Sequence, residues 1–394
     1  MIARDPFTEE ALPSDLAPGV PGDAPVAFTI GGRIPVRNRV LAAPICGASK
    51  LPFRRLARRW GADIAYTEMV KAYPLVRDDP KTLELLHTTT DEAPCGPQIC
   101  GGDPDTMERA AARLEALGFP LVDINMGCPV RKVVNEGAGA ALLRDPAKVE
   151  AVTRACARAV SIPVTVKLRS GWDDDGHVDA ATLARAAEAG GAALVAIHGR
   201  TRAQAHQGAV DFAAMARAKA AVSIPVVGNG GVFTAEAAVV MARETGCDAV
   251  MIGRGAFGRP WLFRDVARAL AGLPALPPPD DEARCDVMRA HLDGMIALLG
   301  ERGVLLYRKY AAWYFREAPW GAHFRDRAYR TREVGTMSAL LDAWRENLAA
   351  SRAALAAGAP PPFPALFADD PTLASADPYE DRGGGPADLP HDLR

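Results

Sequence analysis

The chain alternates short apolar runs with longer Ala- and Arg-rich stretches, and this alternation limits the accessible folds more than any other feature. Each apolar run has the length of a strand and each following stretch the length of a helix. Strands are predicted at residues 40–45, 64–70, 96–100, 121–126, 163–168, 193–198, 225–228 and 249–252. Helices are predicted at about 51–60, 80–87, 104–117, 146–160, 179–190, 211–221, 234–245 and 261–271. This order indicates an α/β fold, a (β/α)8 TIM barrel rather than an open doubly wound sheet.

Composition divides the chain around this barrel domain, which we place at 28–272. Residues 1–27 are rich in Pro, Asp and Gly and predict a disordered N-terminal arm. The proline-rich stretch 273–280 predicts a stiff linker. Residues 281–357 show helical periodicity alone and predict a small all-helical C-terminal domain, with helices at about 281–300, 304–317, 323–330 and 332–355. Residues 358–394 return to Pro, Asp and Gly and predict a disordered tail.

Charge and cysteine content argue against several classes of protein. The formal charge of −2 argues against a protein that coats nucleic acid with its whole surface. No apolar run reaches the length of a membrane span. The seven cysteines are odd in number and contain no C-x-x-C pair, which indicates a reducing cytoplasm and neither a disulfide framework nor a metal site. We expect a cytoplasmic monomer.

The strand ends carry the candidate functional residues, because barrel active sites form at the C-terminal ends of the strands. After the apolar run 121–124 come Asn125 and Cys128, although Cys128 alone reads equally well as a small buried hydrophobe. Lys167 inside an apolar strand is costly unless it meets an anion or a polar ligand; the alternative is that its stem reaches solvent. His198 alone is typical of a core histidine, but Arg200 two residues later favours a ligand site.

Strands seven and eight both end in glycines, in Gly228–Gly231 and Gly253–Gly255. In a barrel the loops after these strands commonly bind phosphate through backbone N–H groups; the alternative is two ordinary tight turns. Residues 253–258 also match the dinucleotide pattern G-x-G-x-x-G. We reject that reading because a helix and the proline linker follow, instead of a second strand ending in an acidic residue.

The predicted helical domain mixes basic and aromatic residues between 302 and 332, which is typical of an RNA-binding surface. The alternative is an amphipathic domain with aromatic side chains inside and solvated arginines outside. The basic residues are Arg302, Arg308, Lys309, Arg316, Arg325, Arg327, Arg330 and Arg332. The aromatic residues are Tyr307, Tyr310, Trp313, Tyr314, Phe315, Trp320, Phe324 and Tyr329.

Several motifs occur together in one order: Pro44 with Gly47, Gln98–Gly101, Asp123–Pro129, Lys167–Trp172, His198–Arg202, Asn229–Gly230, Ile252–Arg254, Gly258–Trp261, Arg308–Lys309 and Trp313–Tyr314. On these motifs, over about residues 32–345, the chain resembles the tRNA-dihydrouridine synthases, most closely their bacterial B-type branch. The resemblance implies reduction of tRNA uridines, expected in the D loop, to 5,6-dihydrouridine. It implies FMN as cofactor, NADPH as reductant, and a helical tRNA-binding domain beside the barrel.

Carried over by position, the resemblance implies that Cys128 donates the proton to C5 after a hydride from reduced FMN reaches C6. It implies FMN binding by Pro44, Ile45, Cys46, Gln98, Lys167, His198, Asn229, Gly230, Gly231, Gly253 and Arg254. It implies substrate or RNA contacts by Asn125, Arg169, Arg200, Arg308 and Lys309. The chain departs from the family at Ile45-Cys46, usually Met-Ala, and at Gly231, often acidic.

Two other functions compete with this interpretation. Another FMN barrel that reduces a free pyrimidine would explain the barrel but not the basic helical domain. An RNA-binding regulator with a vestigial flavin site would purify without colour, which a visible spectrum would detect.

Overall fold

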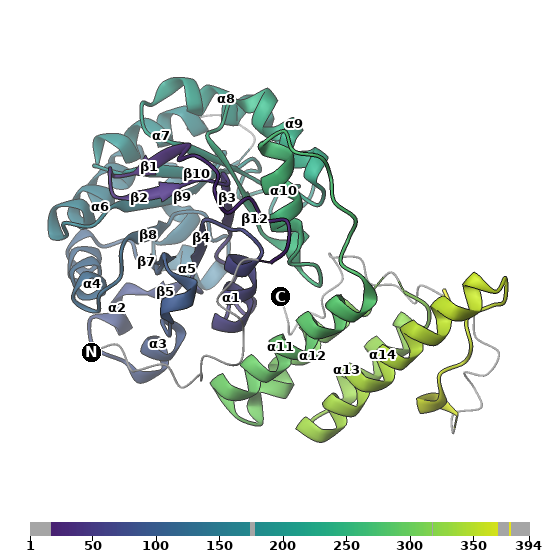
Figure 1. Cartoon of the computed structure of the whole chain (residues 1–394). Helices are drawn as coiled ribbons and strands as arrows, with labels where there is room; N and C mark the ends of the chain where they lie inside the picture. Colours follow the sequence, from purple (N-terminus) through teal and green to yellow (C-terminus); the bar gives the residue numbers. More distant parts are fainter. Residues whose placement is uncertain (1–16, 174–177, 317, 369–377, 380–394) are drawn as a thin grey trace. The chain divides into compact units, whose positions relative to one another are not determined.

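The computed structural model describes residues 17–173, 178–316, 318–368 and 378–379 (Figure 1). These residues form two units. The first contains the described residues up to Gly255 together with Leu262–Leu276. The second contains Ala256–Trp261 and the described residues from Pro277 onward.

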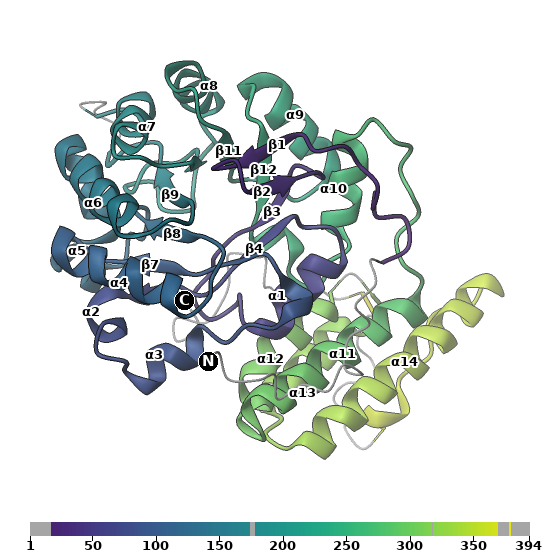
Figure 2. The same ribbon diagram turned by 60° about the vertical axis from the view of Figure 1, so that its left-hand side comes forward.

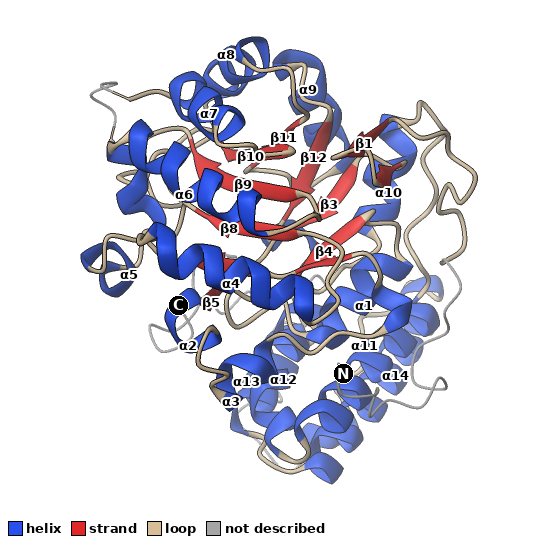
Figure 3. Cartoon of the chain, turned by 90° about the vertical axis from the view of Figure 1, so that its left-hand side faces the viewer, coloured by secondary structure: helices blue, strands red, loops and turns tan. Residues whose placement is uncertain are grey.

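The first unit is built on one sheet in which every pairing is parallel. Its order is β5-β7-β8-β9-β10-β11-β12-β3-β4-β6. The strands are β3 (Val40–Ala42), β4 (Ile64–Tyr66), β5 (Val70–Lys71), β6 (Cys95–Gly96), β7 (Gln98–Cys100), β8 (Val122–Asn125), β9 (Val164–Arg169), β10 (Leu194–His198), β11 (Val226–Asn229) and β12 (Ala249–Ile252). Figure 3 shows these strands enclosed by helices.

The sheet closes into a barrel because its two ends belong to neighbouring strands. β4 and β5 are segments of the predicted second strand, and β6 and β7 are segments of the third. β4 pairs with β6 and β5 pairs with β7, so the ladder returns on itself. Pro97, which has no N–H to donate, separates β6 from β7. The predicted TIM barrel is therefore confirmed, with its second and third strands each interrupted once.

Helices cover the outside of the barrel strands, as α6, α7 and α8 show clearly in Figure 2. The longer ones are α1 (Leu51–Arg59), α4 (Pro104–Ala116), α6 (Pro146–Ala159), α7 (Ala180–Ala189), α8 (Phe212–Ala221), α9 (Ala235–Thr245) and α10 (Leu262–Leu270). Shorter helical segments are α2 (Ala72–Leu75), α3 (Pro80–Leu85), α5 (Arg131–Asn135), η1 (Thr90–Glu92), η2 (Gly139–Arg144) and η3 (Arg254–Ala256). The side chains of Asp103 and Asp145 cap α4 and α6 by accepting backbone N–H groups.

A β-hairpin that the sequence did not predict closes one end of the barrel core. β1 (Phe28–Ile30) and β2 (Ile34–Val36) pair antiparallel. Ile30 and Val36 are fully buried in one cluster with barrel residues such as Leu41. Ahead of the hairpin, buried Ala17 donates its N–H to the carbonyl of Arg59. Of the predicted arm 1–27, Ala17 thus packs with this unit, most of residues 18–27 are exposed, and 1–16 lie outside the described residues.

The second unit is helical, as predicted, and has an aromatic core. It contains α11 (Asp281–Leu299), α12 (Arg302–Tyr314), α13 (Gly321–Arg330), α14 (Val334–Ala356) and η4 (Ala365–Phe367). Buried Phe315 and Phe324 each pack on Trp344 with ring centroids 4.8 Å apart. Phe367, within the predicted tail 358–394, is buried beside Phe324. None of the described helices is long and apolar enough to cross a membrane.

The connection after β12 contributes to this helical unit. Phe257 stacks on Trp313 with ring centroids 4.0 Å apart. Gly258 approaches so closely that a Cβ there would lie 2.3 Å from the carbonyl oxygen of Trp313. Residues Ala256–Trp261, which follow Gly255 directly in the sequence, therefore pack as part of the helical unit.

The hairpin generates a prediction about stability. Ile30→Ala should lower the free energy of unfolding by about 2–5 kcal/mol, because it leaves a cavity in the barrel core. Exposed Thr29→Ala in the same strand is the control and should change it by less than about 0.5 kcal/mol. Chemical denaturation measures both; equal effects would show that the hairpin does not contribute to the core.

Candidate active site

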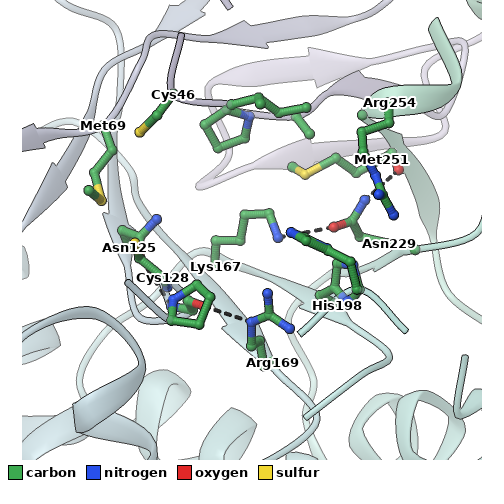
Figure 4. A pocket seen from close by; sticks show the side chains of 18 of the residues that line it. Cys46, Met69, Asn125, Cys128, Lys167, Arg169, His198, Asn229, Met251 and Arg254 are labelled. Atoms are coloured by element: carbon green, nitrogen blue, oxygen red, sulfur yellow. Dashed lines mark hydrogen bonds between the residues drawn. The ribbon is translucent and has the colours of Figure 1, made fainter. Parts of the chain in front are cut away.

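A cavity of about 280 Å³ opens at the C-terminal ends of the barrel strands. Its walls include most of the residues predicted from the sequence: Pro44, Ile45, Cys46, Gln98, Asn125, Cys128, Lys167, Arg169, His198, Asn229, Gly230, Gly231, Gly253 and Arg254. Figure 4 shows side chains of this set gathered around one space. Residues that lie more than 200 positions apart in the sequence thus line one site, as expected where parallel strands end on a common rim.

Cys128 enters this cavity from a loop held by Asn125. The Asn125 side-chain oxygen accepts the backbone N–H groups of Gly127 at 3.1 Å and Cys128 at 2.9 Å. Burial raises the pKa of the Cys128 thiol above its ordinary value, against the smaller lowering effects of Val130 N–H and Arg169. The thiol is therefore protonated at neutral pH and can act as an acid.

Two other thiols lie near Cys128 and are also protonated at neutral pH. Cys46 lines the cavity, and withdrawal from water, with the Glu68 carboxylate next in importance, raises its pKa to about 11. Cys100 is buried, and burial followed by the influence of Cys128 raises its pKa to about 12. A thiol at this rim is thus not unique to Cys128, so its role must be tested against the others.

The cavity wall is rich in basic groups and contains no Asp or Glu among the described residues that line it. Burial, then repulsion from Lys167, lowers the pKa of His198 to about 2. Burial, then repulsion from Arg254, lowers that of His206 to about 4. Burial, then repulsion from Arg169, lowers the pKa of Lys167 to about 8. Both histidines are therefore neutral at neutral pH, and the charged side chains of the wall, Lys167, Arg169 and Arg254, are all cationic, so the wall favours an anion.

The turn after β11 has the backbone expected of an anion-binding loop. Gly230 and Gly231 have φ of +117° and +70°. A Cβ on Gly230 would lie 3.3 Å from the His198 ring, so a larger residue would be strained as well as crowded. The buried Nδ1 of His198 has no hydrogen-bond partner in the described part of the chain. A phosphate-bearing ligand fits this corner, because it would meet backbone N–H groups and buried side-chain donors.

Lys167 and Asn229 form the floor beside this corner. Lys167 Nζ donates to the Asn229 side-chain oxygen at 3.0 Å, and the Asn229 amide donates to the carbonyl of Met251 at 2.8 Å. Lys167 therefore points into the barrel, and the alternative that its side chain reaches out to solvent is wrong. Two of its three ammonium protons remain available for a ligand.

Arg169, predicted to contact substrate or RNA, lines the cavity and also bonds to backbone carbonyls. Its side chain is almost fully buried and donates from Nε to the carbonyl of Gly127 at 2.7 Å. Its Nη1 donates to the carbonyls of Thr201 at 3.0 Å and Ala205 at 2.7 Å. Arg169 thus ties the loop that carries Cys128 to the loop that follows β10.

The remaining predicted contact residues lie elsewhere. Arg200 does not line the cavity; its Nε donates to the carbonyl of Gly208 at 2.9 Å. Arg308 is half-buried and donates to the carbonyl of Tyr329 at 2.7 Å. Lys309 is only 8% exposed and lies over the Tyr310 ring, in the interior of the helical unit.

The aromatic residues of the helical unit are core residues. Of those between 302 and 332, only Tyr329 is exposed; the buried ones are Tyr307, Tyr310, Trp313, Tyr314, Phe315, Trp320 and Phe324. The prediction of an aromatic RNA-binding surface is therefore wrong, and the amphipathic alternative holds. Exposed arginines remain at 302, 327, 330 and 332.

Sequence reasoning also missed residues that line the cavity: Ala43, Met69, Val130, His206, Val232, Phe233 and Met251. Met69 lies where the second strand is interrupted, and His206 lies in a loop eight residues past a strand end. Neither position has a pattern that points to the cavity. In the described residues, no group of His, Cys, Asp or Glu side chains is arranged to hold a metal ion.

Comparison with known proteins identifies the family. The dihydrouridine synthase family model matches residues 40–350. The chain belongs to the dihydrouridine synthase family. It is 40% identical over 333 residues to tRNA-dihydrouridine synthase B of Xanthomonas campestris, covering 84% of this chain and 98% of that protein. It is 41% identical over 307 residues to the protein of the same name from Pseudomonas aeruginosa, covering 77% and 91%.

A third relative has a related name. A probable tRNA-dihydrouridine synthase 1 of Synechocystis is 37% identical over 314 residues, covering 79% of this chain and 87% of that protein. The family match includes the whole cavity lining, from Ala43 to Gly255, and most of the helical unit. Family membership thus applies to both units, including the barrel that holds Cys128.

The bonds of Arg169 generate a prediction about loop order. Arg169→Met should speed amide hydrogen exchange in residues 126–128 and 201–206 by roughly tenfold or more, because three backbone carbonyls lose their donor. Arg200→Met, which removes only the bond to Gly208, should leave 126–128 unchanged. Exchange is measured by mass spectrometry. Equal exchange rates at 126–128 in the two variants would show that Arg169 does not hold this loop.

Proposed function

We propose that this protein reduces uridines in tRNA to 5,6-dihydrouridine. The observation that carries the proposal is one cavity in which a protonated thiol, Cys128, lies with a basic, glycine-rich corner suited to a phosphate. The names of the protein's relatives point to the same substrate class. Saturating the uracil C5–C6 bond needs a hydride at one carbon and a proton at the other, so a cofactor and an acid must share one site.

The cofactor that fits is FMN, which when bound and reduced by NADPH would supply the hydride for C6 of the uracil. Gly230, Gly231, Gly253 and Arg254 would hold its phosphate. Lys167, Asn229, Gln98 and the segment Pro44–Cys46 would hold the rest of the cofactor, and His198 offers its unsatisfied nitrogen. The absence of carboxylates from the described lining suits the anionic cofactor.

The protein's own part in the reaction is to place an acid and exclude competing groups. Cys128 donates its proton to C5, which its raised pKa allows because the thiol stays protonated until C5 gains negative charge. Asn125 holds the loop backbone at Gly127 and Cys128, and Arg169 holds the same loop from the other side. The uridine must leave the base stack to enter a cavity of this size.

Exposed arginines of the helical unit are the proposed tRNA contacts. Three of them, Arg302, Arg327 and Arg332, are exposed. Arg330 is exposed too, but it forms an ion pair with Asp326 at 3.0 Å. Phosphate contacts of this kind give affinity and orientation without reading sequence. Because Lys309 is buried, its contribution is to the packing of the unit, and Arg308 remains the candidate of that pair.

The first test concerns the cofactor. Arg254→Ala should weaken FMN retention, and Gly230→Val should weaken it more, because its backbone lies at φ +117° beside His198. Gly246→Val is the matched control, since Gly246 also has a positive φ, +67°, but ends α9 away from the cavity. Flavin absorbance per folded molecule is measured after purification. Equal occupancy in wild type, Arg254→Ala and Gly230→Val would overturn the phosphate assignment.

The second test concerns the acid. Cys128→Ala should remain yellow, be reduced by NADPH and bind tRNA, yet form dihydrouridine about 10²–10⁴-fold more slowly in a single turnover. Cys128→Ser should also be slow, since a hydroxyl is a far weaker acid than a thiol. Cys100→Ala, a buried thiol outside the cavity, is the control. A wild-type rate in Cys128→Ala, or an equal loss in Cys46→Ala, would assign the proton to another group.

The third test concerns RNA binding. Arg327→Glu and Arg332→Glu should each weaken tRNA binding and lower the slope of log affinity against log salt by about one. Arg352→Glu is the control, because Arg352 is exposed on α14 and already pairs with Asp281. Flavin content should not change. Unchanged tRNA affinity at low salt in both Arg327→Glu and Arg332→Glu would show that this surface has no role in RNA binding.

A further inference from the structure

A buried carboxylate that no part of the proposed reaction uses lies beneath the cavity. Asp123 is 2% exposed on β8, two residues before Asn125, so both side chains point to the same face of the strand, into the barrel. The register pairs Asp123 with Gln98 on β7 and with Thr165 on β9. Three adjacent strands therefore bring polar side chains together at this level of an otherwise apolar core.

These side chains form a single line of hydrogen bonds that ends at the Cys128 loop. Gln98 Nε2 donates to Asp123 Oδ2 at 2.6 Å. Asn125 Nδ2 donates to Gln98 Oε1 at 2.8 Å. Asn125 Oδ1 accepts the N–H groups of Gly127 and Cys128.

The two ends of this line have fixed donor and acceptor roles, and these roles determine how the amides of Gln98 and Asn125 must be oriented. A carboxylate can only accept a hydrogen bond, and a backbone N–H can only donate one. If Gln98 turned its amide over, its oxygen would face the carboxylate. If Asn125 turned over, its NH₂ group would face two N–H groups. Only one orientation of each amide is therefore compatible with the line.

The fixed orientation decides what Asn125 offers to a ligand. Both acceptor positions of its oxygen are filled by Gly127 and Cys128, and one of its amide protons goes to Gln98. Toward the cavity Asn125 can present only its remaining N–H, which suits a carbonyl oxygen of the bound ring and not an N–H.

We infer that Asp123 is a positioning residue: through the amides of Gln98 and Asn125 it holds the backbone of Gly127 and Cys128, and so the thiol, in place. Its effect on dihydrouridine formation rests on the function proposed above, whereas its effect on the loop does not. The other carboxylate oxygen is anchored by the hydroxyl of Thr165. Burial raises the pKa of Asp123 to about 6, so at pH 7.5 to 8 the acceptor at the start of the line is charged and therefore strong.

Three variants separate this role from plain core packing. Asp123→Leu keeps the branched shape but removes the acceptor, which leaves Gln98 free to turn. Asp123→Asn keeps an oxygen toward Gln98 and can donate to the Thr165 hydroxyl, which also accepts. Thr165→Val breaks a buried bond to the same carboxylate but leaves the line to Asn125 intact, so it is the matched control for lost stability.

The readout that does not depend on activity is the reactivity of Cys128. Iodoacetamide alkylation is measured at pH 8 without tRNA and followed for each cysteine by peptide mass spectrometry. In Asp123→Leu the alkylation rate of Cys128 should differ from that of wild type by about threefold or more. Asp123→Asn and Thr165→Val should match wild type at Cys128, and Cys46 in the same samples is the internal reference. Equal Cys128 reactivity in Asp123→Leu and Thr165→Val would overturn the inference.

The kinetic readout tests the consequence for catalysis. Single-turnover dihydrouridine formation should fall about 10- to 100-fold in Asp123→Leu, the range typical for loss of a buried hydrogen bond to a charged group, and Asp123→Asn should restore most of it. The KM for tRNA should change little. A rate in Asp123→Leu equal to that of Thr165→Val would overturn the catalytic part. If wild type itself forms no dihydrouridine, the proposed function fails while alkylation still decides the role of Asp123.

Discussion

Closure of the parallel strands into a ring is the constraint on which the rest of this structure depends. Each strand needs a neighbour on both sides, and the ring provides it although the second and third strands are interrupted. Parallel strands all end on one rim, so Cys46, Cys128 and Arg254 reach one cavity from three distant parts of the sequence. Backbone pairing of the strands, rather than contacts between side chains, thus brings the residues of the site together.

The cavity wall carries positive charge that an anionic ligand can balance. Burial, followed by repulsion from neighbouring cations, lowers the pKa values of His198 and His206 so far that both are neutral at neutral pH, whereas Lys167, Arg169 and Arg254 are cationic. No carboxylate among the described lining residues balances them. The same low-polarity surroundings keep the Cys128 thiol protonated. One environment therefore both favours an anionic cofactor and maintains an acid, which is the combination that reduction of a pyrimidine ring requires.

The sequence was informative where local pattern and burial agree. Lys167 could be assigned to the cavity because a lysine within an apolar strand has few alternatives. The hairpin at 28–36 was missed because three-residue strands are too short to show alternation. The helical unit misled because composition does not say which way a side chain points: Tyr307 and Lys309 face inward. His206 was missed because its place depends on bonds from Arg169 to a loop without any local signal.

If this chain makes dihydrouridine in tRNA with Cys128 as the acid, cells need both the gene and this thiol for the modification. The most direct measurement is dihydrouridine mapping in tRNA from cells that lack the gene, complemented with wild type or Cys128→Ala. We expect defined D-loop uridines to lose the modification on deletion, to regain it with wild type, and to stay unmodified with Cys128→Ala. An unchanged dihydrouridine map after deletion, in cells with no second enzyme of this family, would contradict the claim.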